Sequence, residues 1–210
     1  MVNQKGLKEA YSVKTPEDSI ELYKTWSATY DEDFAKKNDY RSPREIAKYF
    51  TQYMNAKDTP VLDVGAGTGL VGECLQKAFK GEIDAIDISP EMLEMAKSKK
   101  CYTKLIQADL TKKLNINNCS YGAIVSAGTF THGHIGPKVL DELVRITKPN
   151  GLFVFTVHWR LFLKARFKEK FADLKKNITK PVFHEVMAYG NNHDPKHGAD
   201  TVIISVFRKR

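Results

Sequence analysis

The first quarter of the chain carries apolar residues at the spacing of an α-helix. Four of them recur every fourth residue and form one stripe: Leu22, Trp26, Tyr30 and Phe34. This period predicts a helix that buries one face. Residues 15–18 open it with a capping hydroxyl, a proline and two acids. A complete capping box at 42–45 predicts a second helix to about Tyr53. Residues 1–14 have no such pattern, and we expect a loose arm there.

From Pro60 onward, short apolar runs alternate with helical segments. We expect strands at 61–64, 82–87, 104–110, 122–126 and 152–158, and helices at 69–79, 89–99 and 137–146. The polar stretch 111–119 is too short for much of a helix, so that crossover is degenerate or absent. The alternation predicts an α/β fold with a doubly wound, mostly parallel sheet and right-handed crossovers.

The last fifty residues depart from this rhythm. Residues 160–180 contain eight Lys or Arg, and we expect one basic helix there. Two further strands follow, at 182–189 and 201–207. The eleven residues between them are rich in Gly, Asn and Pro and therefore loop, which predicts an antiparallel hairpin at the edge of a seven-stranded sheet.

The length and composition are those of an ordinary globular protein. At 210 residues, with 42% hydrophobic and 28% charged residues, we expect one domain over 1–210. Within it, 15–56 is a helical cap, 60–159 a ligand-binding core, and 160–210 the basic helix and hairpin.

The same composition argues against a membrane span or a secretory signal. No window of 18 uninterrupted apolar residues occurs, and residues 1–11 lack an apolar core. The three cysteines, Cys74, Cys101 and Cys119, are odd in number and scattered, which predicts reduced thiols and a cytoplasmic location.

The net charge of +8 raises the possibility of a nucleic-acid partner. Much of the excess lies in 160–180 and in the final three residues, 208–210. A lysine-rich helix face is usually a solvated surface, so nucleic-acid binding is possible but not favoured.

A glycine turn follows the first expected strand, with Gly65, Gly67 and Gly69 at alternate positions. Glycine allows the sharp turn and lets a ligand approach the backbone, which presents N–H groups at a helix start. The dinucleotide fingerprint requires glycine where this chain has Leu70. The spacing G-x-G-x-G, with Asp63 two residues earlier, instead resembles motif I of S-adenosylmethionine-dependent methyltransferases.

Asp87 ends the second strand, 22 positions after Gly65. An acid is expected about 20 residues beyond such a turn, where a carboxylate accepts hydrogen bonds from both ribose hydroxyls. Ile88 and Met92 would then flank an adenine. The alternative, that Asp87 caps the next helix, is weakened because Ser89 already suits that position.

Asp109 ends the third strand and is followed by Leu110. Its carboxylate can accept from the exocyclic amine of an adenine, with Leu110 against the ring. Alone, an aspartate here is a common turn former. Because the ends of adjacent parallel strands form the ligand site of open α/β sheets, Asp87 and Asp109 together with the glycine turn predict one cofactor site.

These features together resemble the Rossmann-like S-adenosylmethionine-dependent methyltransferases over nearly the whole chain. Residues 148–151 look like that family's K-P-G-G turn, and residues 126–137, 30–31 and 40–43 are similar to the Williams–Beuren-region methyltransferase-like proteins. The resemblance implies methyl transfer from S-adenosylmethionine with release of S-adenosyl-L-homocysteine. It does not imply a particular acceptor.

The resemblance also implies roles for individual residues. Gly65, Gly67 and Gly69, with Ala66 between them, would line the methionine portion of the cofactor. Other implied contacts are Asp63, which orients the turn, Ala127 beneath the sulfonium, and Tyr30 and Arg41, which close over the cofactor, Arg41 pairing with its carboxylate.

His132 and His134 lie on the loop after the fourth strand, where an acceptor should arrive. A histidine there can act as a general base if the acceptor must lose a proton. A metal pair would need a third ligand, and none has motif spacing, so we expect no metal site. Hydrogen bonding of either ring to the loop backbone is the structural alternative.

Four functions compete at this point. The leading one is a methyltransferase for a small molecule. The alternatives are an RNA- or protein-directed methyltransferase that uses the basic helix 160–180, and a cofactor-binding partner without catalysis. A dehydrogenase is the fourth, against which Leu70 counts.

Overall fold

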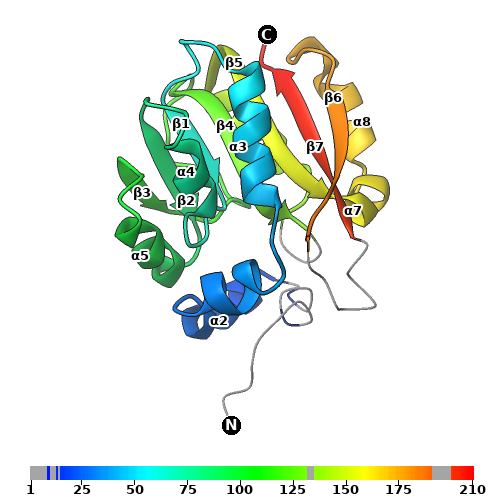
Figure 1. Cartoon of the computed structure of the whole chain (residues 1–210). Helices are drawn as coiled ribbons and strands as arrows, with labels where there is room; N and C mark the ends of the chain where they lie inside the picture. The colour runs from blue at the N-terminus through cyan, green and yellow to red at the C-terminus, as the bar shows by residue number, and fades with distance from the viewer. Residues whose placement is uncertain (1–8, 10–12, 14, 132–134, 191–199) are drawn as a thin grey trace.

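The computed structural model describes residues 9 and 13 and the ranges 15–131, 135–190 and 200–210. Its centre is a seven-stranded sheet in the order β3-β2-β1-β4-β5-β7-β6 (Figure 1). The strands are β1 Val61–Val64, β2 Ile83–Asp87, β3 Lys104–Gln107, β4 Tyr121–Phe130, β5 Thr147–His158, β6 Val182–Met187 and β7 Thr201–Arg208. Strands β1 to β5 pair in parallel, whereas β7 is antiparallel to β5 and to β6. The predicted fold class is confirmed.

Helices cover both faces of the sheet. They are α2 Pro16–Trp26, the π-helix η1 Asp31–Lys36, α3 Ser42–Tyr53, α4 Leu70–Leu75, α5 Pro90–Ser98, α6 Val139–Ile146, α7 Trp159–Lys164, α8 Phe167–Asp173 and the 3₁₀ turn η2 Leu174–Lys176. Strand β1 shows how the sheet separates two apolar layers. Val61 packs in the layer that contains α3 and α4, while Leu62 and Val64 pack in the layer with α6 and α8.

The N-terminal helix lies across the end of the sheet at which the parallel strands finish (Figure 1). Thr15 caps α2 through a reciprocal pair of hydrogen bonds with Asp18, as the sequence predicts. The apolar stripe does not continue as one helix, because α2 ends at Trp26 and the chain resumes as η1. The stripe still forms one cluster, with Trp26 and Phe34 buried against Tyr189.

The expected capping box at 42–45 is wrong. Ser42 already lies inside α3, and the N-cap residue is Arg41, which makes no side-chain cap bond. A long-range contact competes with the local signal: the Arg41 N–H donates to the Ala188 carbonyl at 2.9 Å. An isolated bridge between Tyr40 and Tyr189 lies beside it. The segment before α3 is thus tied to the C-terminal hairpin.

The single basic helix over 160–180 is also wrong. Arg166 adopts a left-handed conformation with φ of 60°, which separates α7 from α8. The break lets Phe162, Phe167 and Phe171 pack into the same core cluster. The basic residues therefore lie on two short helices and a 3₁₀ turn rather than along one continuous face.

Strand β4 is longer than the expected 122–126 and reaches Phe130. Its pairing with β5 is irregular between Ser126 and Phe130, and Gly128 has φ of +81°. Such an irregularity bends the strand near its end and changes the direction in which its side chains point. It places residues 127–129 beside the glycine turn.

The expected hairpin of the last two strands is confirmed. Arg208 ties β7 to the segment before β1: its guanidinium pairs with both oxygens of Asp58, at 2.8 and 3.0 Å, and donates to the Tyr53 carbonyl. In the parts of the chain that the structure describes, no helix is both long and apolar enough to cross a membrane.

Candidate functional site

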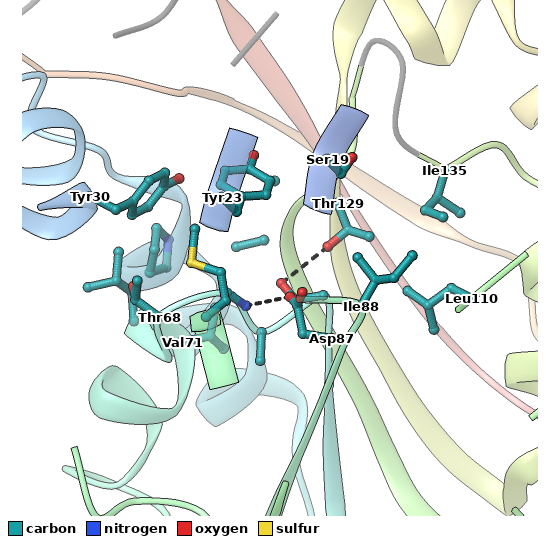
Figure 2. A pocket seen from close by; sticks show the side chains of 18 of the residues that line it. Ser19, Tyr23, Tyr30, Thr68, Val71, Asp87, Ile88, Leu110, Thr129 and Ile135 are labelled. Carbon is teal, nitrogen blue, oxygen red and sulfur yellow. Dashed lines mark hydrogen bonds between the residues drawn. The ribbon is translucent and has the colours of Figure 1, made fainter. Parts of the chain in front are cut away.

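A cavity of about 920 Å³, counting the space at its mouth, lies where β1, β2 and β4 end. We call it the first cavity. Figure 2 shows side chains around it from the sheet ends, the glycine turn and α2, whose Ser19 and Tyr23 lie opposite Asp87. It is lined by Pro16, Ser19, Tyr23, Tyr30, Tyr40, Pro43, Gly65, Ala66, Gly67, Thr68, Leu70, Val71, Asp87, Ile88, Met92, Asp109, Leu110, Ala127, Gly128, Thr129 and Ile135.

The glycine turn forms one wall of this cavity. Gly67 has φ of +54°, and a Cβ added there would meet no atom within 4 Å, so a ligand can approach the backbone directly. Gly65 has φ of +65°, and its added Cβ would lie 2.1 Å from Thr129 Oγ1. Two hydroxyls support the turn from β4, because Ser126 Oγ and Thr129 Oγ1 lie 2.6 and 2.9 Å from the Val64 carbonyl oxygen.

Asp87 links the glycine turn to the start of α5. Its Oδ2 accepts from the Gly67 N–H at 2.8 Å, and its Oδ1 accepts from the Ser89 N–H at 2.9 Å. Burial raises the pKa of this carboxyl, and the backbone donors, led by Ser89 and Gly67, oppose that rise only in part. Each carboxylate oxygen has two lone pairs, so acceptor capacity remains for a ligand at the cavity wall.

Asp63 supports the turn from below. It is fully buried, and its Oδ2 accepts from the Tyr102 hydroxyl at 2.6 Å. The same hydroxyl oxygen accepts from the Gly72 N–H at 3.1 Å, which joins β1 to α4. Burial is the main cause that raises the pKa of Asp63 to about 7.

The far end of the cavity is apolar with one acid. Ile88, Met92 and Leu110 line it together with Asp109. Burial raises the pKa of the Asp109 carboxyl, but hydrogen bonds from Thr111 outweigh that effect, so the net pKa is lowered. The acid is therefore ionised at neutral pH beside an apolar wall.

Aromatic side chains from the N-terminal segment cover the cavity. Tyr23 and Tyr30 lie above the glycine turn (Figure 2), and Tyr40 also lines the cavity. Burial raises the pKa of all three phenols, that of Tyr40 to about 12. All three are neutral in the physiological range and exclude water rather than supply charge.

A polar latch holds this cover on the turn. Asp31 of η1 accepts from the Thr68 hydroxyl at 2.6 Å and from the Lys99 ammonium at 2.6 Å. Lys99 also contacts Glu73 at 3.2 Å. Burial lowers the pKa of Lys99, but the two carboxylates more than reverse this, so the pKa is raised. Three segments far apart in sequence therefore meet at one charged cluster.

Replacing Asp31 with alanine should loosen the cover. Both bonds to Thr68 and Lys99 are lost, and because Asp31 is partly exposed we expect the free energy of unfolding to fall by only about 1–2 kcal/mol. Limited proteolysis should cut residues 15–41 faster. The matched control is Glu32→Ala, which removes only an exposed pair with Lys36. Equal proteolysis of the two variants would contradict the latch.

A second cavity, of about 530 Å³ when the space at its mouth is counted, adjoins the first. Tyr23, Tyr30, Tyr40 and Gly128 line both. The other lining residues are Phe34, Ser42, Phe130, Thr131, Thr156, His158, Ala188, Tyr189 and Val202. The two cavities together follow the ends of β1, β2, β4 and β5.

The structure brings most of the predicted cofactor residues to the first cavity: Tyr30, Gly65, Ala66, Gly67, Asp87, Ile88, Met92, Asp109, Leu110 and Ala127. Three others lie outside it. Arg41 is paired with Asp39 at 3.0 Å, Asp63 lies beneath the turn, and a Cβ added at Gly69 would meet the Tyr102 ring. His132 and His134 lie outside the described residues.

Several lining residues had not been assigned to the site from the sequence. Thr68 and Thr129 each carry a hydroxyl near a glycine, a weak signal that many turns share. Tyr23 follows Leu22 and is not part of the four-residue apolar repeat, so the repeat gave no reason to assign Tyr23 to the site. Val71 lies in the expected helix 69–79, where an apolar residue predicts core packing rather than ligand contact.

Known proteins with similar sequences indicate the class to which this site belongs. A family model described as "Methyltransferase domain" matches residues 62–155. Human methyltransferase-like protein 27 is 29% identical over 153 residues, which cover 71% of this chain and 62% of the relative. A malonyl-[acyl-carrier protein] O-methyltransferase of Halalkalibacterium halodurans is 36% identical over 110 residues, 49% of this chain and 41% of its own. The chain thus spans less than two thirds of either relative.

Solved structures show the same fold at low identity. A SAM-dependent methyltransferase from Leishmania major has a TM-score of 0.66 at 17% identity, covering 91% of this chain and 82% of its own. A methyltransferase of Haloferax volcanii, solved in complex with a methyltransferase activator, has a TM-score of 0.62 at 18% identity and covers 89% and 96%.

Fold and site together define a Rossmann-like domain of the S-adenosylmethionine-dependent class. Residues 62–155 match the methyltransferase-domain family model, and the resemblance noted from the sequence is confirmed. The cofactor of this class is S-adenosylmethionine. The site fits it, because Gly67 leaves its backbone open to a ligand and Asp87 presents a carboxylate at the cavity wall.

Proposed function

We propose that this protein is a methyltransferase that uses S-adenosylmethionine to methylate a small molecule. The observation that carries the proposal is the pair of adjoining cavities, one with a glycine cradle and acids, the other aromatic, which meet at Tyr23, Tyr30, Tyr40 and Gly128. A transferase needs two ligands side by side, and their positioning provides most of the rate.

Each described group in the first cavity has a proposed role. Asp87 would accept from the ribose hydroxyls, and the glycine turn would hold the methionine portion. Ile88, Met92 and Leu110 would enclose the adenine, with Asp109 near its amine. When bound, the sulfonium cofactor supplies an electrophilic methyl group. The chain contributes orientation and a neutral, water-poor cover of tyrosine rings.

The small-molecule acceptor is favoured over RNA by the charge of the site. Among the described residues that line the two cavities, none is Lys or Arg. Binding of nucleic acid depends on cationic contacts to phosphate. The basic residues of 160–180 lie instead on α7, α8 and η2, and Lys170 is paired with Asp141.

Titration calorimetry tests the cofactor assignment directly. S-adenosyl-L-homocysteine should bind with one site per chain, because Asp87 and the glycine turn form one cavity. NAD should not bind, because Leu70 replaces the glycine that the dinucleotide fingerprint needs. Binding of NAD without S-adenosyl-L-homocysteine would end the methyltransferase proposal.

A further inference from the structure

The second cavity has a polar floor at its boundary with the first. Thr156 and His158 lie two residues apart on β5 and both line the cavity. Thr156 Oγ1 accepts from the Gly128 N–H at 3.1 Å, and Gly128 lines both cavities. A polar atom of a ligand on this floor would therefore lie beside the cofactor cavity.

The His158 ring is fixed in this floor. Its Nδ1 accepts from the Arg160 N–H at 3.3 Å, which assigns the ring proton to Nε2. Nε2 lies 3.3 Å from Asp200 Oδ2, and both side chains are 3% exposed. Asp200 also lies 3.7 Å from the Arg160 guanidinium. The histidine is thus oriented on one side by a backbone group and on the other by a carboxylate.

One wall of the cavity is a cluster of three aromatic rings that contact one another. Tyr40 and Tyr189 have ring centroids 5.7 Å apart, and Phe34 lies 5.5 Å from Tyr40 and 6.0 Å from Tyr189. Aromatic faces of this kind favour flat apolar rings, which stack or meet them edge to face. The cavity holds about 530 Å³ when the open space at its mouth is counted, so a ligand ring would extend from the aromatic wall toward the mouth.

The described residues of the second cavity offer no ion pair to a charged ligand. Among its described lining residues none is Asp, Glu, Lys or Arg. The carboxylate of Asp200, which contacts the His158 ring, lies behind that ring and is shared with Arg160. A carboxylate, phosphate or ammonium group on the ligand would lose its hydration without gaining an ion pair, which is costly.

We propose that the second cavity binds the methyl acceptor, and that this acceptor is an uncharged molecule built on a flat ring with one hydroxyl group. The proposal rests on the methyltransferase function proposed above and narrows its acceptor. The ring packs against the aromatic wall, and the hydroxyl accepts from the Thr156 O–H on the floor that Thr156 forms with His158.

Three naphthalene probes of similar shape and different charge test this class: 2-naphthol, 2-naphthoate and protonated 2-naphthylmethylamine. Their binding is measured by equilibrium dialysis at neutral pH, with the chain saturated with S-adenosyl-L-homocysteine. We expect 2-naphthol to bind at least about tenfold more tightly than either charged probe. Tighter binding of a charged probe would overturn the acceptor class.

Single substitutions test whether 2-naphthol binds in the second cavity. Val202 lines the second cavity and not the first, so Val202→Phe should weaken 2-naphthol at least about tenfold and leave S-adenosyl-L-homocysteine unchanged. His158→Gln, which removes the ring that forms part of the floor, should weaken 2-naphthol binding about three- to tenfold. The matched control is His184→Gln, on β6, where the ring contacts Tyr49 and Tyr53 outside both cavities.

The outcomes separate the two proposals. If S-adenosyl-L-homocysteine binds and 2-naphthol does not, the acceptor assignment is overturned and the methyltransferase proposal stands. Unchanged 2-naphthol binding in Val202→Phe would place the probe elsewhere and overturn the site. Failure of the unaltered chain to bind S-adenosyl-L-homocysteine would count against the proposed function itself. Retained S-adenosyl-L-homocysteine binding in each variant shows that the variant is folded.

Discussion

Asp87→Ala should lower the affinity for S-adenosyl-L-homocysteine about 10- to 150-fold in titration calorimetry, as expected for the loss of a charged acceptor worth about 1.5–3 kcal/mol. Two effects act together. The ribose hydroxyls lose their acceptor, and the Gly67 N–H loses the carboxylate that holds the glycine turn at 2.8 Å. Both changes occur on the same wall of the first cavity.

The control for this variant is a second buried acid on the same strand. Asp84 accepts from the Tyr121 hydroxyl at 3.0 Å and does not line the first cavity. Asp84→Asn should therefore change the affinity less than about twofold. Equal losses in the two variants would show that Asp87 acts through general stability, and an unchanged affinity in Asp87→Ala would remove it from the site.

Asp63→Asn should remove a large pH dependence from folding stability. Burial raises the pKa of this carboxyl from 3.8 to about 7, and Asp63 Oδ1 has no hydrogen-bond partner among the described residues. Between these values the folded chain holds a proton that the unfolded chain has lost. The stability from this group is complete below pH 3.8, and about 4 kcal/mol is lost as the pH rises through about 7.

Urea denaturation of both proteins between about pH 4 and 8 measures this effect. An amide cannot ionise, so the difference in the free energy of unfolding should shift in favour of Asp63→Asn as the pH rises. The pH dependence of all other groups cancels in that difference. A difference that stays constant over the whole interval would show that Asp63 is ionised throughout.

Features carried by neighbouring residues could be predicted from the sequence. The glycine turn, the capping of α5 by Ser89 and the position of Asp87 each depend on a few consecutive residues and on strand order. Because parallel strands end at one edge of the sheet, predicting the strands also predicted that Asp87 and Asp109 would share a cavity.

Features that depend on distant partners could not be predicted. Arg41 was expected at the cofactor, but Asp39 is closer and pairs with it. Nothing local to Asp31 indicates that it will meet Thr68 and Lys99. The left-handed turn at Arg166 contradicts the helical preference of its neighbours, and it forms where the flanking phenylalanines gain core packing.

The position of β7 also sets an order of events during folding. Strand β7 lies between β5 and β6, although both are translated before it. Among the named strands β6 pairs only with β7, so β6 joins the sheet only after β7 has paired with β5 or together with it. Since Tyr189 follows β6 and lines the second cavity, that cavity is complete only after residues 201–208 have paired. A partly folded chain without β7 in place would expose the unpaired edge of β5 to other chains.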